Sequence, residues 1–212
     1  MVFTSNIFLF LFLPVFLLVY YLVKDSWRSH VIVLGSYAFY AWWRPDFLLL
    51  FVGISYWNYW FGMLIKRRID ADNKRAAFRL LCLGVAGNLA ALGYFKYANF
   101  GFEVLNDVLT PLGVNTFTLE HIILPLGISF YVFQAISYIV DIYRKDAEPT
   151  TRFVDFAAFI ALFPQLIAGP ILRYSLIDKQ LKQRTHSLEL FSLGASRFML
   201  GFVKKVLIAD SL

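Results

Sequence analysis

A polar stripe in an apolar stretch of the chain carries side chains suited to chemistry inside a membrane. Its members recur at intervals of three, four and three residues, on one face of a helix: Gln134, Ser137, Asp141 and Arg144. Polar groups inside a bilayer are costly and usually face the protein interior or a cavity. The stripe therefore has two interpretations. It lines a substrate path, or it holds neighbouring helices together through hydrogen bonds.

A second candidate is the apolar stretch Phe156–Leu172, which is close to membrane length but contains Pro164, Gly169 and Pro170. Proline removes a backbone donor, and a Gly-Pro pair marks a second break. Broken backbone at membrane depth survives only where it is buried in protein or lines a watery cavity. We expect a re-entrant pair of half-helices that forms part of a substrate path. The alternative is an ordinary kinked helix that crosses the membrane once.

The elements that must position these residues are membrane helices. The chain is 59% hydrophobic, 19% aromatic and only 16% charged, which is typical of a polytopic integral membrane protein and predicts an all-α fold. A spanning helix needs about 20 apolar residues. Five stretches come near this length: 2–23, 29–43, 47–65, 80–95 and 122–140. The stretch 190–212 is amphipathic, and we expect it to lie in the membrane interface.

Charge placement orients the chain, because short cytoplasmic loops collect Lys and Arg. Lys and Arg are frequent in the loop 66–79, so we expect this loop on the inside. The polar connector 98–120 contains neither Lys nor Arg, so we expect it on the outside. Alternation then places Lys24 and Arg28 in the cytoplasm and the uncharged N-terminus in the periplasm. Basic groups flank 156–172 on both sides, which favours a segment that enters from the cytoplasm and turns back.

Other side chains support no metal or disulfide chemistry within the chain. Cys82 is the only cysteine, which excludes an internal disulfide or a cysteine metal site. The three histidines, His30, His121 and His186, are interpreted as surface or capping residues. We expect no bound metal or cofactor and no nucleic-acid partner. The lipid bilayer is the first partner that the composition implies.

Three runs resemble the N-terminal half of bacterial membrane-bound O-acyltransferases: LPLGISFYVFQAISYIVDIYR from Leu124, FPQLIAGPILR from Phe163, and GFVKKVLIAD from Gly201. The opening MVFTSN, the run YAFYAWWRPDFLLL from Tyr37 and the run GYFKYANF from Gly93 are similar, more narrowly, to the membrane subunit of alginate O-acetylation systems. The matches extend from end to end of the 212 residues. The chain is therefore interpreted as the N-terminal part of one membrane acyltransferase domain, 1–212, truncated before its end.

The resemblance implies an enzyme of the bacterial inner membrane. It would take acetyl from a cytoplasmic donor, acetyl-CoA, and relay it to periplasmic acetyltransferase partners and a polysaccharide acceptor, with alginate favoured. Family chemistry rests on a histidine in a later apolar segment, and none of the three histidines here has that context. No catalytic residue is assigned. The candidates that line the substrate path are Gln134, Pro164, Gln165, Gly169, Pro170 and Arg173.

Two alternatives stay open at this point. The chain could be a non-catalytic membrane scaffold or transporter, in which the broken segment is a docking or permeation element. It could also be a related acyltransferase with another acceptor, such as a different exopolysaccharide or a D-alanylated cell-wall polymer.

Overall fold

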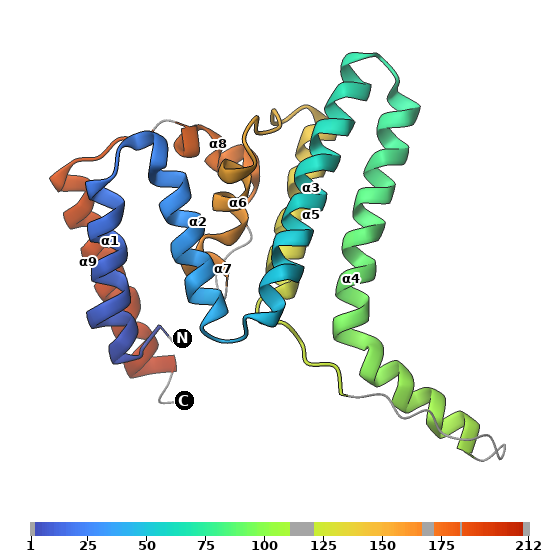
Figure 1. Cartoon of the computed structure of the whole chain (residues 1–212), viewed down its shortest axis with the longest axis horizontal. Helices are drawn as coiled ribbons and strands as arrows, with labels where there is room; N and C mark the ends of the chain where they lie inside the picture. Colours follow the sequence, from blue (N-terminus) through green and yellow to red (C-terminus); the bar gives the residue numbers. More distant parts are fainter. Residues whose placement is uncertain (1–2, 111–120, 167–171, 183, 210–212) are drawn as a thin grey trace.

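The structure is a computed structural model of the whole chain, and it describes residues 3–110, 121–166, 172–182 and 184–209. The described residues form helices and loops and contain no strand, so the all-α prediction is confirmed for them (Figure 1). In chain order the elements are η1 (Phe8–Phe12), α1 (Leu13–Leu22), α2 (Asp25–Ala41), α3 (Asp46–Asp70), α4 (Lys74–Leu109), α5 (Ile128–Arg144), α6 (Phe153–Ala161), α7 (Phe163–Leu166), α8 (Tyr174–Lys182), α9 (Leu188–Lys204) and η3 (Lys205–Ala209).

Two of these helices, α3 and α4, are long and apolar enough to cross a membrane by length and composition. The apolar helix over Phe8–Leu22 is shorter, and α2 and α5 have 17 residues each. The five predicted spans thus correspond to five helical segments. The length criterion supports two of them as spans, and crossing by the other three stays a prediction.

The connector after the fourth predicted span is more regular than its sequence suggests. We expected a polar connector over 98–120, outside the membrane, yet α4 runs without interruption through Gly101 to Leu109. Its 36 residues rise roughly 54 Å, well beyond the ~30 Å of a hydrocarbon core. Figure 1 shows the far end of α4 bending away from the other helices. Residues 111–120 of the predicted connector lie outside the described residues.

The fifth predicted span begins later than expected. We placed its start at residue 122, but α5 begins at Ile128, after the non-helical residues 121–127. Pro125 lacks a backbone donor and Gly127 has a left-handed backbone with φ 72°, so neither continues a helix. Asn99 of α4 contacts residues 121–127, because its side chain donates to the Ile122 carbonyl at 2.7 Å and accepts from the Ile122 N–H at 3.0 Å.

The main core lies where α3, α4 and α5 meet, and α6 and α8 cover it. Small residues let these helices approach closely, as is common in membranes. A Cβ added at Gly62 of α3 would come within 2.6 Å of the Tyr138 ring of α5. Asn58 and Asn88 are buried between α3 and α4 and exchange two hydrogen bonds of 2.8 Å. The two amides therefore join the two helices through hydrogen bonds.

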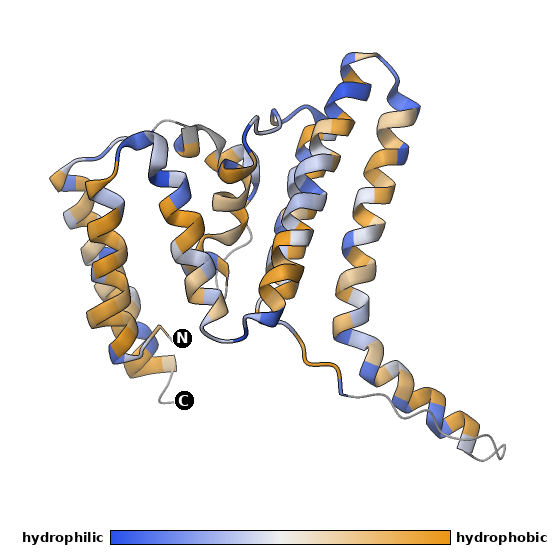
Figure 2. Cartoon of the chain, viewed as in Figure 1, coloured by the Kyte–Doolittle hydropathy of each residue, from blue (hydrophilic) through white to orange (hydrophobic). Residues whose placement is uncertain are grey.

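Charged groups predicted to be cytoplasmic gather at one end of the molecule. Lys66 at the end of α3 forms a 2.8 Å ion pair with Glu148 in the loop after α5. Arg184, which follows α8, donates to Ser29 near the start of α2 at 2.9 Å. Figure 2 shows hydrophilic residues mainly at the helix ends and hydrophobic residues along the middles. This common end, at the top of Figure 1, is called the basic end below.

Helix α9 lies alongside α1. It runs antiparallel to α1: Tyr21 contacts Phe191 at 5.9 Å between ring centroids, and a groove at the other end joins Phe3 and Phe8 to Phe202. An interfacial helix would instead cross α1 at a steep angle. The predictions that 2–23 spans and that 190–212 lies in the interface therefore cannot both hold. The described part of the second segment, up to Ala209, follows the axis of α1, and the membrane placement of both segments stays a prediction.

Candidate functional site

The segment predicted to be re-entrant is broken, but earlier than expected. Helix α6 ends at Ala161, and Leu162 leaves the helical region with φ −48° and ψ 104°. The Phe163 N–H then donates to the buried Ser36 hydroxyl of α2 at 3.2 Å. Pro164 is the second residue of the short helix α7, where a missing donor has no cost. The break therefore comes two residues before the proline, and a side chain of another helix satisfies its backbone.

The turn after this break is held against the start of α5. A Cβ added at Gly127 would come within 2.4 Å of the Leu166 backbone oxygen, so only glycine fits there. The positive φ of Gly127 also favours glycine at this position. On the next turns of α5, the Gln134 side-chain amide donates to the Phe159 carbonyl at 3.0 Å. Helix α5 thus fixes both α6 and α7 through backbone contacts.

The chain then returns to the end from which it entered. Tyr174, at the start of α8, contacts the rings of Tyr138 and Phe159 at 4.9 and 5.2 Å between centroids. The next residue, Ser175, donates to the buried carboxylate of Asp141 near the end of α5 at 3.2 Å. Entry and return at one end is the course expected of a re-entrant segment. The return leg 167–171 lies outside the described residues.

The predicted path residues do not converge on one cavity within the described parts of the chain. Gln134 is buried and bonded to α6, which agrees with the helix-holding interpretation of its stripe. Pro164 faces an apolar groove between η1, α7 and α9, Gln165 is half-buried in α7, and Arg173 is exposed just before α8. Gly169 and Pro170 lie outside the described residues. A role in lining a path stays a prediction for all six.

A polar pocket opens at the basic end, between the start of α2, the start of α6 and the end of α8. Its volume is about 500 Å³, and its lining residues are Asp25, Ser26, Ser29, Arg152, Asp155, Leu181, Arg184 and Thr185. Sequence inspection did not single out this set. The one available signal was that three basic segments, distant in sequence, were all predicted to be cytoplasmic.

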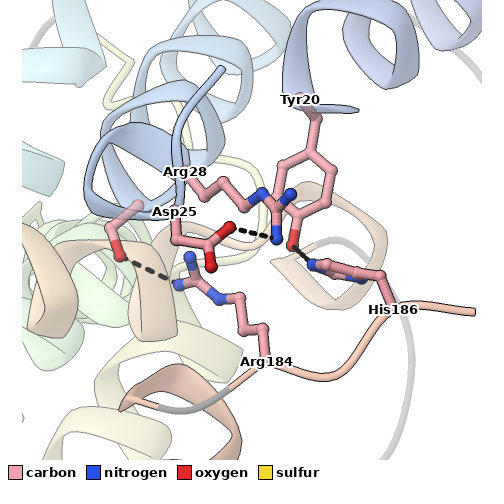
Figure 3. A network of polar contacts seen from close by, with 6 residues as sticks. Tyr20, Asp25, Arg28, Arg184 and His186 are labelled. Atoms are coloured by element: carbon pink, nitrogen blue, oxygen red, sulfur yellow. Dashed lines mark hydrogen bonds and ion pairs between the residues drawn. The ribbon is translucent and has the colours of Figure 1, made fainter. Parts of the chain in front are cut away.

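Figure 3 shows the network beside this pocket. The Arg28 guanidinium pairs with the Asp25 carboxylate at 2.7 Å, and Arg184 donates to Ser29 at 2.9 Å. The Tyr20 hydroxyl lies 3.5 Å from His186 Nε2. Loss of solvent around the imidazole and the nearby positive charge of Arg28 lower the pKa of His186. These contacts join the α8–α9 loop to the α1–α2 turn.

No protein-family model matches the chain, and no solved structure matches it significantly. Curated proteins do match it over its whole length. It is 56% identical over 214 residues to the probable alginate O-acetylase AlgI of Pseudomonas aeruginosa and 55% identical over 214 residues to that of Azotobacter vinelandii. The chain matches the N-terminal part of these relatives.

The match covers 100% of this chain but 40% of the P. aeruginosa protein and 42% of the A. vinelandii protein. The chain therefore spans about two fifths of the length of these relatives. A protein named peptidoglycan O-acetyltransferase, from Helicobacter pylori, is 32% identical over 243 residues, again across 100% of this chain and 45% of its own length. The resemblance that the sequence motifs suggested is thus confirmed.

Proposed function

We propose that the chain is the entry part of a membrane O-acetyltransferase. In this proposal the protein takes acetyl from acetyl-CoA in the cytoplasm and relays it across the bacterial inner membrane for O-acetylation of an exopolysaccharide, alginate. The observation that carries the proposal is the 56% identity, over the whole chain, to a probable alginate O-acetylase. Acetyl-CoA serves as substrate, and no resident cofactor is invoked.

The broken segment supports a path rather than a plain anchor. Helices α6 and α7 enter from the basic end, and contacts to Ser36 of α2 and Gln134 of α5 satisfy polar backbone groups beside the break. Such irregular backbone is tolerated at membrane depth only inside protein or beside water. We assign the entry of the donor to the basic end and the exit to the end that carries the N-terminus, which we place in the periplasm. Acceptors and partner acetyltransferases would then meet the protein on the periplasmic side.

We assign no catalytic residue to these 212 residues. The family's histidine chemistry would come from a part of the protein outside them. His186 is exposed and contacts tyrosine rings at the basic end, and His121 is exposed before α5. These settings differ from the apolar segment in which the resembled family carries its histidine.

The acceptor is the least constrained part of this proposal. The 32% identity to a peptidoglycan O-acetyltransferase favours one second candidate, in which acetyl goes to peptidoglycan. A scaffold or transporter without chemistry is the alternative from another functional class. Acetyl measurements on cells separate the three functions.

The experiment compares a strain lacking the encoding gene with the same strain complemented by the full-length gene. O-acetyl content is measured separately on alginate and on peptidoglycan. Loss on alginate alone supports the proposal, and loss on peptidoglycan alone supports the second candidate. Unchanged acetylation of both polymers would remove the enzymatic proposal.

The donor is tested with membrane vesicles from the complemented strain. Inverted vesicles expose the cytoplasmic face, so labelled acetyl-CoA should transfer its acetyl group there and not to right-side-out vesicles. Substituting histidines in later apolar segments of the full-length protein completes the test. The scaffold alternative is abandoned if one such variant stops transfer while the protein still inserts and binds its partners.

A further inference from the structure

We propose that the polar pocket at the basic end binds a phosphate group of a cytoplasmic ligand. Arg184 is the central residue of this pocket. Its guanidinium donates to the neutral Ser29 hydroxyl, and the ion pairs of the described residues leave it without a carboxylate partner. A planar arginine fork matches phosphate oxygens in geometry as well as charge. A half-buried cation facing a cavity is the usual basis of such recognition.

The acidic residues of the pocket do not cancel this charge. The Asp25 carboxylate is 2.7 Å from Arg28, and the Asp155 carboxylate is 4.0 Å from Arg152. Arg152 and Arg184 line the space together with Asp25 and Asp155, and Arg28, outside the lining, pairs with Asp25. Arg184 is therefore the cation of this group that no ion pair with a carboxylate of the described residues neutralises. Arg184 is half-buried, so its charge is screened less by salt than that of a fully exposed side chain.

Helix α2 adds a second attraction for an anion. Ser26 and Ser29 lie in its first turns and line the pocket. The first backbone N–H groups of a helix have no partner within it, and the helix dipole favours negative charge there. Ser26 and Thr185 both line the space, and the hydroxyl of either residue can serve as an additional donor. Arginine, hydroxyls and a helix N-terminus together form a phosphate-binding arrangement.

The position of the pocket limits the ligand to the cytoplasmic side. Its three segments are all predicted to be cytoplasmic, and the structure brings them together at one end. Two sources of phosphate meet that end: a soluble phosphorylated donor and the headgroup of an anionic phospholipid. The proposal deepens the proposed function, on which it rests for the soluble donor. Phosphate recognition itself does not depend on acetyl transfer.

The test uses the full-length protein in detergent, with adenosine 3′,5′-bisphosphate as the soluble probe and calorimetry as the measurement. Arg184→Gln should weaken probe binding about tenfold or more, because a hydrogen bond to a charged group is lost. Arg68→Gln is the matched control, since Arg68 is exposed at the same end but does not line the pocket. It should leave binding within about twofold of the unchanged protein.

A second variant keeps the test valid if Arg184→Gln misfolds. Ser26→Glu places a negative charge in the pocket while leaving the Arg184–Ser29 bond in place. Ser26 is exposed in the first turn of α2, where an acidic side chain is well tolerated, so folding should persist. Probe binding should fall to a similar extent through repulsion.

The lipid source is tested in nanodiscs of phosphatidylcholine with or without phosphatidylglycerol. If the purified protein retains phosphatidylglycerol, and both pocket variants lose it while Arg68→Gln does not, the site binds a lipid headgroup. Probe binding with the same pattern of loss assigns it to a soluble ligand. If neither ligand depends on Arg184 or Ser26, the proposal is overturned. Acetyl transfer is not measured here, so failure of the site and failure of the proposed function are separate results.

Discussion

At the scale of single residues, the two buried asparagines are the clearest polar contact between helices. Each amide also donates to the carbonyl four residues earlier, Asn58 to Ile54 at 2.9 Å and Asn88 to Gly84 at 2.8 Å. Asn58→Leu should therefore lower the free energy of unfolding by about 1–3 kcal/mol, because Asn88 loses both bonds to its partner.

The measurement is denaturation of the full-length protein as the fraction of sodium dodecyl sulfate is raised. The Asn58→Leu and Asn88→Leu variants and their double variant form a cycle. We expect a coupling of about 1–2 kcal/mol, since either single change already breaks the pair. Additive effects would show that the two amides act independently.

His186 adds a pH dependence to the contact between the α8–α9 loop and α1. Because its pKa is lowered in the folded protein, the unfolded chain binds more protons just below the ordinary histidine pKa of about 6.5. The contribution of His186 to stability should thus be fully present above a pH of about 6.5 and should be lost as the pH falls through the lowered pKa. Lys24 lies in the connecting turn, and the charged groups that face the imidazole are Arg28, Arg184 and Asp25.

Melting temperatures measured at about pH 7.5 and pH 5.5, on either side of the ordinary histidine pKa, test this pH dependence. His186→Gln should reduce the difference between the two temperatures. His121→Gln is the control, because His121 is exposed and outside this network. An equal effect of both variants would contradict the assignment.

At the scale of elements, Gly127 joins α5 to the broken segment. Gly127→Ala should destabilise the protein by about 2 kcal/mol or more, because the new Cβ meets a backbone oxygen and the φ angle is unfavourable for alanine. Gly93→Ala is the control: a Cβ there has nothing within 4 Å, and alanine favours the helix. Thermal unfolding of the two full-length variants should move in opposite directions.

Sequence periodicity predicted which segments are helical, but it predicted neither where α6 ends nor where α9 lies. Pro164 was expected to break the segment 156–172, yet the break is at Leu162, because Ser36 on a distant helix accepts the Phe163 N–H. Likewise the amphipathic pattern of 190–212 fits an interface and a helix beside α1 equally well. Only tertiary contacts distinguish these arrangements. The candidate site shows the same limit, since the pocket residues come from three segments whose proximity no local pattern encodes.

At the scale of the whole molecule, the positive-inside rule and the structure agree on which loops share an end. The remaining question is the end at which α9 finishes. In a Cys82→Ser background, a cysteine at Ala209 should be labelled from the same side as one at Arg44 and from the opposite side to one at Ala71. These sites lie at the end of η3, in the α2–α3 turn and in the α3–α4 turn, respectively. Labelling of the cysteine at Ala209 from the side of Ala71 would support the prediction that 190–212 lies in the membrane interface.

The asparagine pair also bears on how the protein is made. Helices α3 and α4 are consecutive in the chain, and only residues 71–73 separate them. Emerging alone, each would carry an unsatisfied amide into lipid, whereas a hairpin that pairs the two amides hides both. Insertion as a single unit during synthesis is therefore favoured, before α5 has left the ribosome. Helices α3 and α4 would then be paired before α6 and α7 are made, and the broken segment would fold against helices that are already in place.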